Sequence, residues 1–184
     1  MDHSLNNEEV GNIVGRPITM IPYTDVCMYD DIDDLFATDS VLLNYLSDDN
    51  YGHWVGLYKK GNKITFFDSY GKLPDSQLEY IPMKYRVESN QDYPYLVKLL
   101  KNWVDEDPKR SIHYNNEQFQ KYSSKITTCG RWVGFFLKYA PNTTVEEFEK
   151  IFSEFRDDYL REYSLKGIDR DMFFDNLIVN LTDP

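Results

Sequence analysis

The sequence predicts an α+β fold, in which helices pack against a central mixed or antiparallel sheet. Two runs rich in β-branched and aromatic residues, 53–60 and 63–68, flank a Gly-Asn pair, which is a strong signal for a β-hairpin. Apolar residues recur at helical spacing in 93–104 and 129–139. With 184 residues, of which 41% are hydrophobic, the chain is long enough to bury one core. We therefore expect a single domain over residues 1–184.

The hairpin is expected to place a histidine and a carboxylate side by side. Val41–Leu46 predicts a strand that feeds a loop, so that His53 begins the next strand at one end of the sheet. If the hairpin strands are antiparallel, facing residues have numbers that sum to about 123. Asp68 then faces Val55 and lies within reach of His53. Its carboxylate can hold one imidazole nitrogen while the other nitrogen faces a reacting group.

Two further helices follow the hairpin. Tyr93–Val104 is amphipathic and is expected to pack on the sheet through one apolar side, made of Leu96, Val97, Leu99, Leu100 and Trp103. The helix over 129–139 carries Trp132, Val133, Phe136 and Leu137 at buried helical spacing. Its first turn contains Cys129, and Gly130 beside it would let a substrate carbonyl approach the backbone closely.

The end of the chain predicts more helix. After Pro141, a capping box for a helix over Val145–Phe155 is indicated by Thr143 or Thr144 followed by Glu146 or Glu147. Asp169 or Asp171 could cap a last helix through Leu181. We expect residues 141–184 to form a helical extension of a core over about 20–140. The extension either completes that core or docks a partner.

Four side chains along the chain supply the parts of a thiol catalyst. A free cysteine has a pKa of about 8.5, and a neighbouring imidazole or a helix N-terminus lowers it to roughly 3.5–7.5. Cys129 could have both, since His53 is the candidate base and the thiol opens a helix. Gln120 could donate an amide N–H to the oxyanion of a tetrahedral intermediate. The order His53, Asp68, Gln120, Cys129 indicates a cysteine protease.

These motifs resemble a known superfamily. The sequence resembles adenovirus proteases and SUMO proteases (clan CE) in four motifs. These are the His-Trp pair, the Phe-Asp-Ser-Tyr-Gly run that begins at the end of the β-rich residues 63–68, the Gln and the Cys-Gly pair. They look most like the capsid-maturation proteases of virophages, Polinton-type elements and related double-stranded DNA viruses. The resemblance covers roughly residues 20–140. It implies a papain-like fold of the adenovirus-protease (adenain) type and peptide hydrolysis.

The resemblance also implies a role for each site residue. His53 matches the base, Asp68 its orienter, Cys129 the nucleophile and Gln120 the oxyanion donor. Trp54, which matches the indole after the catalytic histidine, and Gly130 are expected to contact substrate. Two departures leave choices open: Gln118 is an alternative oxyanion donor, and Arg131, where many relatives carry a smaller or apolar residue, could tune the thiolate or meet an acidic substrate.

Other chemistry-bearing residues favour ordinary roles. Cys27 lies in an acidic stretch that would raise a thiol pKa, so we expect it to be structural. The acidic cluster at 30–34 lacks the glycine and distal glutamate of a calcium-binding loop. His3 and His113 have no Cys or His partner at zinc-ligand spacing. We expect no metal and no cofactor.

Charge and composition limit the partners and the compartment. The formal charge of −11 argues against nucleic acid as a partner and suits a neutral or basic protein substrate. The acidic N-terminus does not look like a signal peptide, and no stretch approaches a membrane span. We expect a monomer that acts in virions and in the host cytoplasm, at the virus factory, with a possible activating peptide or protein.

The sequence therefore predicts a thiol endopeptidase that cleaves capsid or other virion precursor proteins during assembly and maturation. Three alternatives stay open at this point. The same residues serve proteases that remove ubiquitin-like modifiers from host proteins. Effector acetyltransferases of bacteria resemble the superfamily and use the same triad with acetyl-coenzyme A. A binding module that kept the fold without turnover is the alternative outside enzymes.

Overall fold

The computed structural model describes residues 4–48, 51–123, 125–162, 167 and 169–183, and a five-stranded mixed sheet forms its middle layer. The strands follow one another in chain order across the sheet: β1 (Thr19–Pro22), β2 (Ser40–Leu46), β3 (Gly52–Lys60), β4 (Lys63–Asp68) and β5 (Ser111–Tyr114). The three central strands are antiparallel, and the short edge strands β1 and β5 pair parallel to their neighbours. This arrangement confirms the predicted α+β class.

The hairpin has the predicted register. Val55 of β3 lies opposite Asp68 of β4, and the pairing continues to Lys60 opposite Lys63. Gly61 makes the turn at a φ of 57°, a left-handed conformation that glycine adopts without steric strain because it has no Cβ. The hairpin thus brings the start of β3 and the end of β4 to the same end of the sheet.

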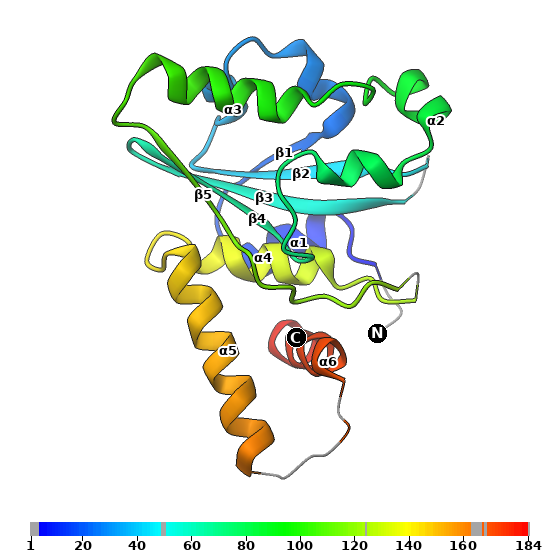
Figure 1. Ribbon diagram of the computed structural model, residues 1–184, viewed down its shortest axis with the longest axis vertical. Helices are drawn as coiled ribbons and strands as arrows, with labels where there is room; N and C mark the ends of the chain where they lie inside the picture. The colour runs from blue at the N-terminus through cyan, green and yellow to red at the C-terminus, as the bar shows by residue number, and fades with distance from the viewer. Residues whose placement is uncertain (1–3, 49–50, 124, 163–166, 168, 184) are drawn as a thin grey trace.

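Helices cover both faces of the sheet (Figure 1). One face carries α3 (Tyr95–Glu106) together with the short 3₁₀ turns η1 (Tyr23–Met28) and η2 (Ile32–Leu35). The opposite face carries α1 (Asn7–Val14) and α4 (Cys129–Tyr139), and beyond α4 lie α5 (Val145–Glu162) and α6 (Arg170–Thr182). The turn η3 (Ser76–Tyr80) and the helix α2 (Met83–Glu88) connect β4 to α3.

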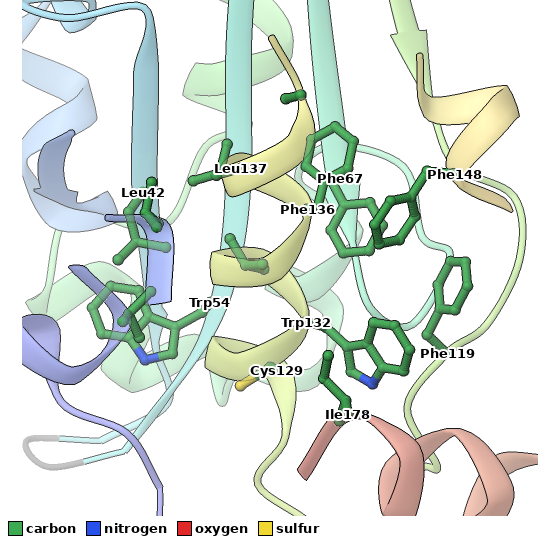
Figure 2. Packing of buried hydrophobic residues seen from close by; sticks show 14 of the residues in the cluster. Leu42, Trp54, Phe67, Phe119, Cys129, Trp132, Phe136, Leu137, Phe148 and Ile178 are labelled. Carbon is green, nitrogen blue, oxygen red and sulfur yellow. The ribbon is translucent and has the colours of Figure 1, made fainter. Parts of the chain in front are cut away.

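Alternation along the strands divides the core into two parts. Successive strand residues point to opposite faces, so neighbours in sequence enter different clusters. Leu42, Trp54 and Phe67 pack toward α4, whereas Leu43, Val55 and Phe66 pack toward α3. The aromatic side chains of α4 and α5 fill the first cluster, where the Phe67 and Phe136 rings stack with centroids 4.5 Å apart (Figure 2).

The amphipathic helix differs from the prediction in two details. It begins at Tyr95 rather than Tyr93, because Pro94, which occupies the N-cap position, disfavours a helical backbone at the residue before it. Leu96, Leu99, Leu100 and Trp103 are buried as predicted, but Val97 is 41% exposed. The prediction that Val97 belongs to the apolar side was wrong, since the residue that follows Leu96 points away from the buried side of the helix.

The helices after Pro141 complete the core. Thr144 and Glu147 form the predicted capping box at the start of α5, with reciprocal bonds of 3.2 and 2.8 Å. The helix runs to Glu162, past the predicted end at Phe155, because no glycine or proline interrupts 156–162. Asp169 caps the last helix through the N–H of Met172, as one of the two predicted alternatives.

One helix near the N-terminus was not predicted. Helix α1 is preceded by Asn6, whose side chain accepts from the Glu9 N–H while the Glu9 carboxylate accepts from the Asn6 N–H. An Asn followed three residues later by a Glu is a recognised sequence pattern for a capping box, and it would have predicted the helix. Within the described ranges, none of the helices combines the length and the apolar character needed to cross a bilayer.

Candidate active site

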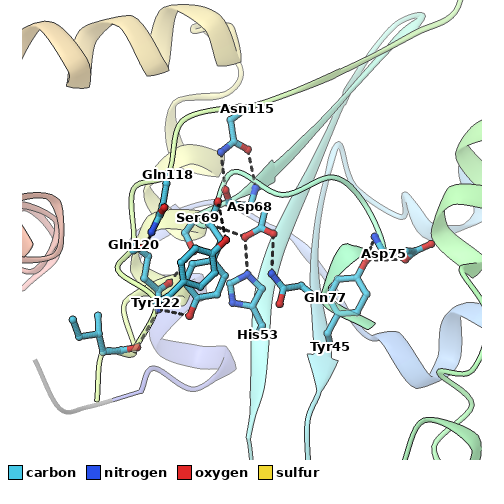
Figure 3. A network of polar contacts seen from close by, with 12 residues as sticks. Tyr45, His53, Asp68, Ser69, Asp75, Gln77, Asn115, Gln118, Gln120 and Tyr122 are labelled. Atoms are coloured by element: carbon cyan, nitrogen blue, oxygen red, sulfur yellow. Dashed lines mark hydrogen bonds and ion pairs between the residues drawn. The ribbon is translucent and has the colours of Figure 1, made fainter. Parts of the chain in front are cut away.

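His53 and Asp68 meet at the end of the hairpin, as the register requires. His53 is the second residue of β3, and Asp68 is the last residue of β4 and fully buried. The imidazole Nε2 and the carboxylate Oδ1 are 2.7 Å apart (Figure 3). A bond of this length to a buried carboxylate fixes the ring and makes Nε2 the nitrogen that donates.

The Asp68 carboxylate is itself held from several sides. Its Oδ1 also accepts from the Tyr70 backbone N–H at 2.9 Å, and its Oδ2 accepts from the Gln77 amide at 3.1 Å. Asn115 bonds both the N–H and the carbonyl of Asp68, at 2.9 and 2.6 Å. Gln77 and Asn115 lie in no motif, so no sequence pattern indicates either of them.

Cys129 completes the group from a separate element. It is the first residue of α4, is 6% exposed, and lies beside the His53 side chain, whose hydrogen bonding and positive charge act to lower the pKa of its thiol. Because Nε2 is engaged with Asp68, Nδ1 is the nitrogen that faces the thiol. The imidazole therefore lies between a buried carboxylate and a buried thiol.

The electrostatic surroundings favour charge separation between these two groups. Burial raises the pKa of the Cys129 thiol, but the hydrogen bond and positive charge of His53 and the N–H groups of Trp54 and Gly130 outweigh it, and the net pKa is lowered. Burial lowers the pKa of His53, but the charge and hydrogen bond of Asp68 and the contact with Cys129 outweigh it, and the net pKa is raised. Both directions favour a thiolate beside an imidazolium.

Gln120 lines a pocket together with His53 and Cys129, and its amide has a defined orientation. Its Nε2 donates to the Ile126 carbonyl at 3.0 Å, and because a carbonyl only accepts, this contact identifies the nitrogen. The second N–H points to the Tyr70 hydroxyl at 3.2 Å, while Oε1 accepts from the buried Ser69 hydroxyl at 2.8 Å. The alternative, Gln118, donates to the Gln120 carbonyl and does not line the pocket.

Stacked aromatic rings form one wall of the pocket. Tyr70 stacks on His53 with ring centroids 4.6 Å apart and an interplanar angle of 13°, and Tyr122 stacks on Tyr70 at 4.4 Å and 16°. The pocket has a volume of about 340 Å³, within the usual range for ligand sites. No lysine or arginine is found among its described lining residues. Tyr70 belongs to the Phe-Asp-Ser-Tyr-Gly motif, but its stacking could not be foreseen.

Three residues given a role beside the nucleophile also have contacts outside the pocket. Trp54 and Gly130 pack closely: a Cβ on Gly130 would meet the indole at 3.2 Å and Val10 at 3.0 Å. Neither is among the described residues that line the pocket, but the backbone N–H groups of both help to lower the pKa of the Cys129 thiol. Arg131 donates to Thr182 and Asp183 at the end of α6 and is not among the described residues that line the pocket.

The remaining candidates have structural partners. The Cys27 thiol donates to the Thr24 carbonyl. In the acidic cluster, Asp31 caps η2 and Asp33 pairs with Lys59. His113 pairs with the Glu146 carboxylate, and His3 lies outside the described residues. Over the part of the chain that the structure describes, no group of three or more His, Cys, Asp or Glu side chains could hold a metal ion.

The sequence of the chain is similar to that of a virophage protein. No family model matches the sequence. Over 131 residues the chain is 38% identical to uncharacterized protein V9 of Sputnik virophage, a match that covers 70% of this chain and 72% of the relative. The chain belongs to the same family as this virophage protein. The relative's printed description assigns it no activity.

A solved structure with a similar fold comes from another virus. The crystal structure of the selenomethionine-labelled ASFV pS273R protease matches with a TM-score of 0.42 and 15% sequence identity. The match covers 80% of this chain and 62% of the protease, so the chain spans less than two thirds of that protein's length.

Proposed function

We propose that the chain is a cysteine endopeptidase in which Cys129 is the nucleophile, His53 the base and Asp68 the orienter. The observation that carries the proposal is the position of the His53 ring, between the buried Asp68 carboxylate and the thiol at the start of α4. A thiolate at a helix N-terminus, paired with an oriented imidazolium, is an activated nucleophile. We treat residues 1–184 as one protease domain.

The reaction follows from these positions. The Cys129 thiolate attacks the peptide carbonyl carbon, and the carbonyl oxygen becomes an oxyanion. The Gln120 amide, by releasing the Tyr70 hydroxyl, and the Cys129 backbone N–H donate to that oxyanion. The C–N bond breaks as His53 gives its proton to the departing amine. His53 then takes a proton from water as the resulting hydroxide attacks the thioester, so that the peptide leaves as a carboxylic acid and the thiolate–imidazolium pair is restored.

The proposed substrates are capsid or other virion precursor proteins, cleaved during assembly and maturation. Sequence similarity to a virophage protein supports a role in a virus. The Phe-Asp-Ser-Tyr-Gly and Cys-Gly motifs resemble those of viral maturation proteases. The proposed compartments are the virion and the host cytoplasm, and the proposed form is a monomer that meets no nucleic acid. The pocket gives a coenzyme A phosphate no lysine or arginine among the described lining residues, which favours hydrolysis over acetyl transfer.

The test is cleavage of a candidate capsid precursor protein. Purified protein, its Cys129→Ala variant and the matched control Cys27→Ala would each be incubated with the precursor and followed by intact mass. Cleavage by wild type and by Cys27→Ala, but not by Cys129→Ala, is the expected result. Acetylated product formed only with acetyl-coenzyme A, or no turnover of the precursor and of a proteome-derived peptide library, would contradict the proposal.

A further inference from the structure

A buried carboxylate on the last helix joins the residues that follow Gln120 and precede Cys129. Asp175 of α6 is fully buried, and its Oδ2 accepts from the Lys121 backbone N–H at 3.0 Å. Its Oδ1 accepts from the Thr128 hydroxyl. Lys121 is adjacent in sequence to Gln120, and Thr128 is adjacent to Cys129. One side chain therefore bonds both ends of the segment that separates the proposed oxyanion donor from the proposed nucleophile.

The bond to Thr128 also changes how α4 begins. Thr128 occupies the N-cap position, where a threonine hydroxyl ordinarily accepts from an N–H of the first helical turn. Here it makes no such bond, and the hydroxyl donates to Asp175, which holds the Thr128 side chain toward α6. The Gly130 N–H in that turn contacts the Cys129 thiol and helps to lower its pKa. By holding the Thr128 side chain toward α6, Asp175 keeps the hydroxyl oxygen from accepting this N–H.

The bond to Lys121 acts on the other side of the pocket. The segment between Lys121 and Thr128 contains Ile126, whose carbonyl accepts from the Gln120 amide at 3.0 Å. A segment fixed at both ends keeps that acceptor in place, and the acceptor keeps the amide turned toward the pocket. The Lys121 ammonium pairs in addition with Asp169, the residue before α6, which anchors the same end again.

We propose that Asp175 is a positioning residue for the active site, which sets the place of the Gln120 amide relative to Cys129 and keeps the first turn of α4 uncapped. The proposal rests on the proposed function for its effect on turnover, but its effect on the thiol does not need turnover. In this proposal α6, which lies beyond the part of the chain with recognisable motifs, helps to position the residues of the active site.

Two variants separate the two actions of Asp175. Asp175→Ala removes both bonds and frees the Thr128 hydroxyl to cap α4. Thr128→Val removes one bond and the competing hydroxyl together. Asp175→Asn can keep both contacts, since its oxygen can accept from the Lys121 N–H and its amide can donate to the Thr128 hydroxyl. Asp183→Ala, at the exposed end of α6, is the control for loss of a carboxylate from this region.

The measurements are the pH profile of Cys129 alkylation and the steady-state constants for peptide cleavage. We expect Asp175→Ala to move the alkylation profile to higher pH and to lower kcat by about 10- to 100-fold with KM unchanged, as loss of an oriented donor does. Thr128→Val should lower kcat without moving the profile, and Asp175→Asn and Asp183→Ala should behave like wild type.

The outcomes distinguish the two claims. A wild-type profile for folded Asp175→Ala would overturn the positioning proposal, whether or not the protein cleaves peptides. Equal shifts in Asp175→Ala and Thr128→Val would also overturn it, because they would indicate a general loss of structure. If Asp175→Ala does not fold, a wild-type kcat for Thr128→Val overturns it. Absence of peptide cleavage by wild type would instead contradict the proposed function, while the alkylation profiles would still decide the role of Asp175.

Discussion

Gly56 sits where β3 packs against α4, and it controls how closely the strand bearing His53 approaches the helix bearing Cys129. A Cβ at position 56 would lie 2.9 Å from Cγ1 of Val133 and 3.3 Å from two atoms of Leu137. Val133 is stiff and lies about one helical turn beyond the thiol, so it cannot swing away. We predict that Gly56→Ala forces the helix and the strand apart.

The expected cost follows from two opposing effects. Overpacking of a core costs about 1–3 kcal/mol, and replacing a strand glycine by alanine returns roughly 0.5–1 kcal/mol. Urea unfolding should therefore show a net loss of about 0.5–2 kcal/mol with an unchanged m-value, and peptide cleavage per folded molecule should fall by about 10-fold because reacting groups are displaced.

A double-mutant cycle checks that the contact with Val133 is the cause. Val133→Ala removes the colliding methyl, so the double variant should be more stable than the sum of the single effects implies, by at least about 1 kcal/mol. Gly11→Ala, whose Cβ would meet only the methyl of Met20 at 3.3 Å, is the matched control and should be neutral or stabilising. Additive effects, or a Gly56→Ala variant more stable than wild type, would refute the reasoning.

Three further predictions concern the site and the last helices. Asp68→Asn should lower kcat by about 10-fold, since a neutral acceptor replaces a charged one. It should also move the alkaline limit of activity to lower pH, because the carboxylate that raises the pKa of the imidazole is gone; an unmoved pH–rate profile would contradict this. Gln120→Leu should lower kcat by about 10²–10³ with the alkylation rate of the thiol unchanged, whereas Gln118→Leu should change neither; equal losses in the two variants would count against the assignment. Thr144→Ala should cost about 1 kcal/mol in thermal or urea unfolding through loss of the cap on α5, with activity per folded molecule preserved, and no change in stability would contradict the capping box.

The sequence was sufficient for the parts of the site that depend on local pattern. The Gly-Asn turn and the strand composition fixed the register that places Asp68 near His53, and the apolar spacing after Cys129 predicted the helix that begins there. Both inferences use interactions between residues close in sequence, or a symmetry that a hairpin imposes.

The rest depends on contacts between distant segments. Gln77 reaches the Asp68 carboxylate from a 3₁₀ turn, and Asn115 reaches the Asp68 backbone from a loop. Asp175 bonds Thr128 and Lys121, which lie 47 and 54 positions before it in the chain. Polar residues with no periodicity give no signal for such partners. The short edge strands β1 and β5 could not be predicted either, because four residues are too few to show the alternation of polar and apolar side chains.

The most direct test of the account compares the reactivity of the two cysteines. Wild type and His53→Ala would be treated with iodoacetamide at neutral pH, where an ordinary thiol with a pKa of about 8.5 is mostly protonated, and the modification of each cysteine would be followed by mass spectrometry. The account predicts that Cys129 reacts at least about 10-fold faster than Cys27 in wild type, that cleavage is lost in step with its modification, and that His53→Ala removes the difference. Equal rates at both cysteines in wild type, or an unchanged Cys129 rate in His53→Ala, would contradict it.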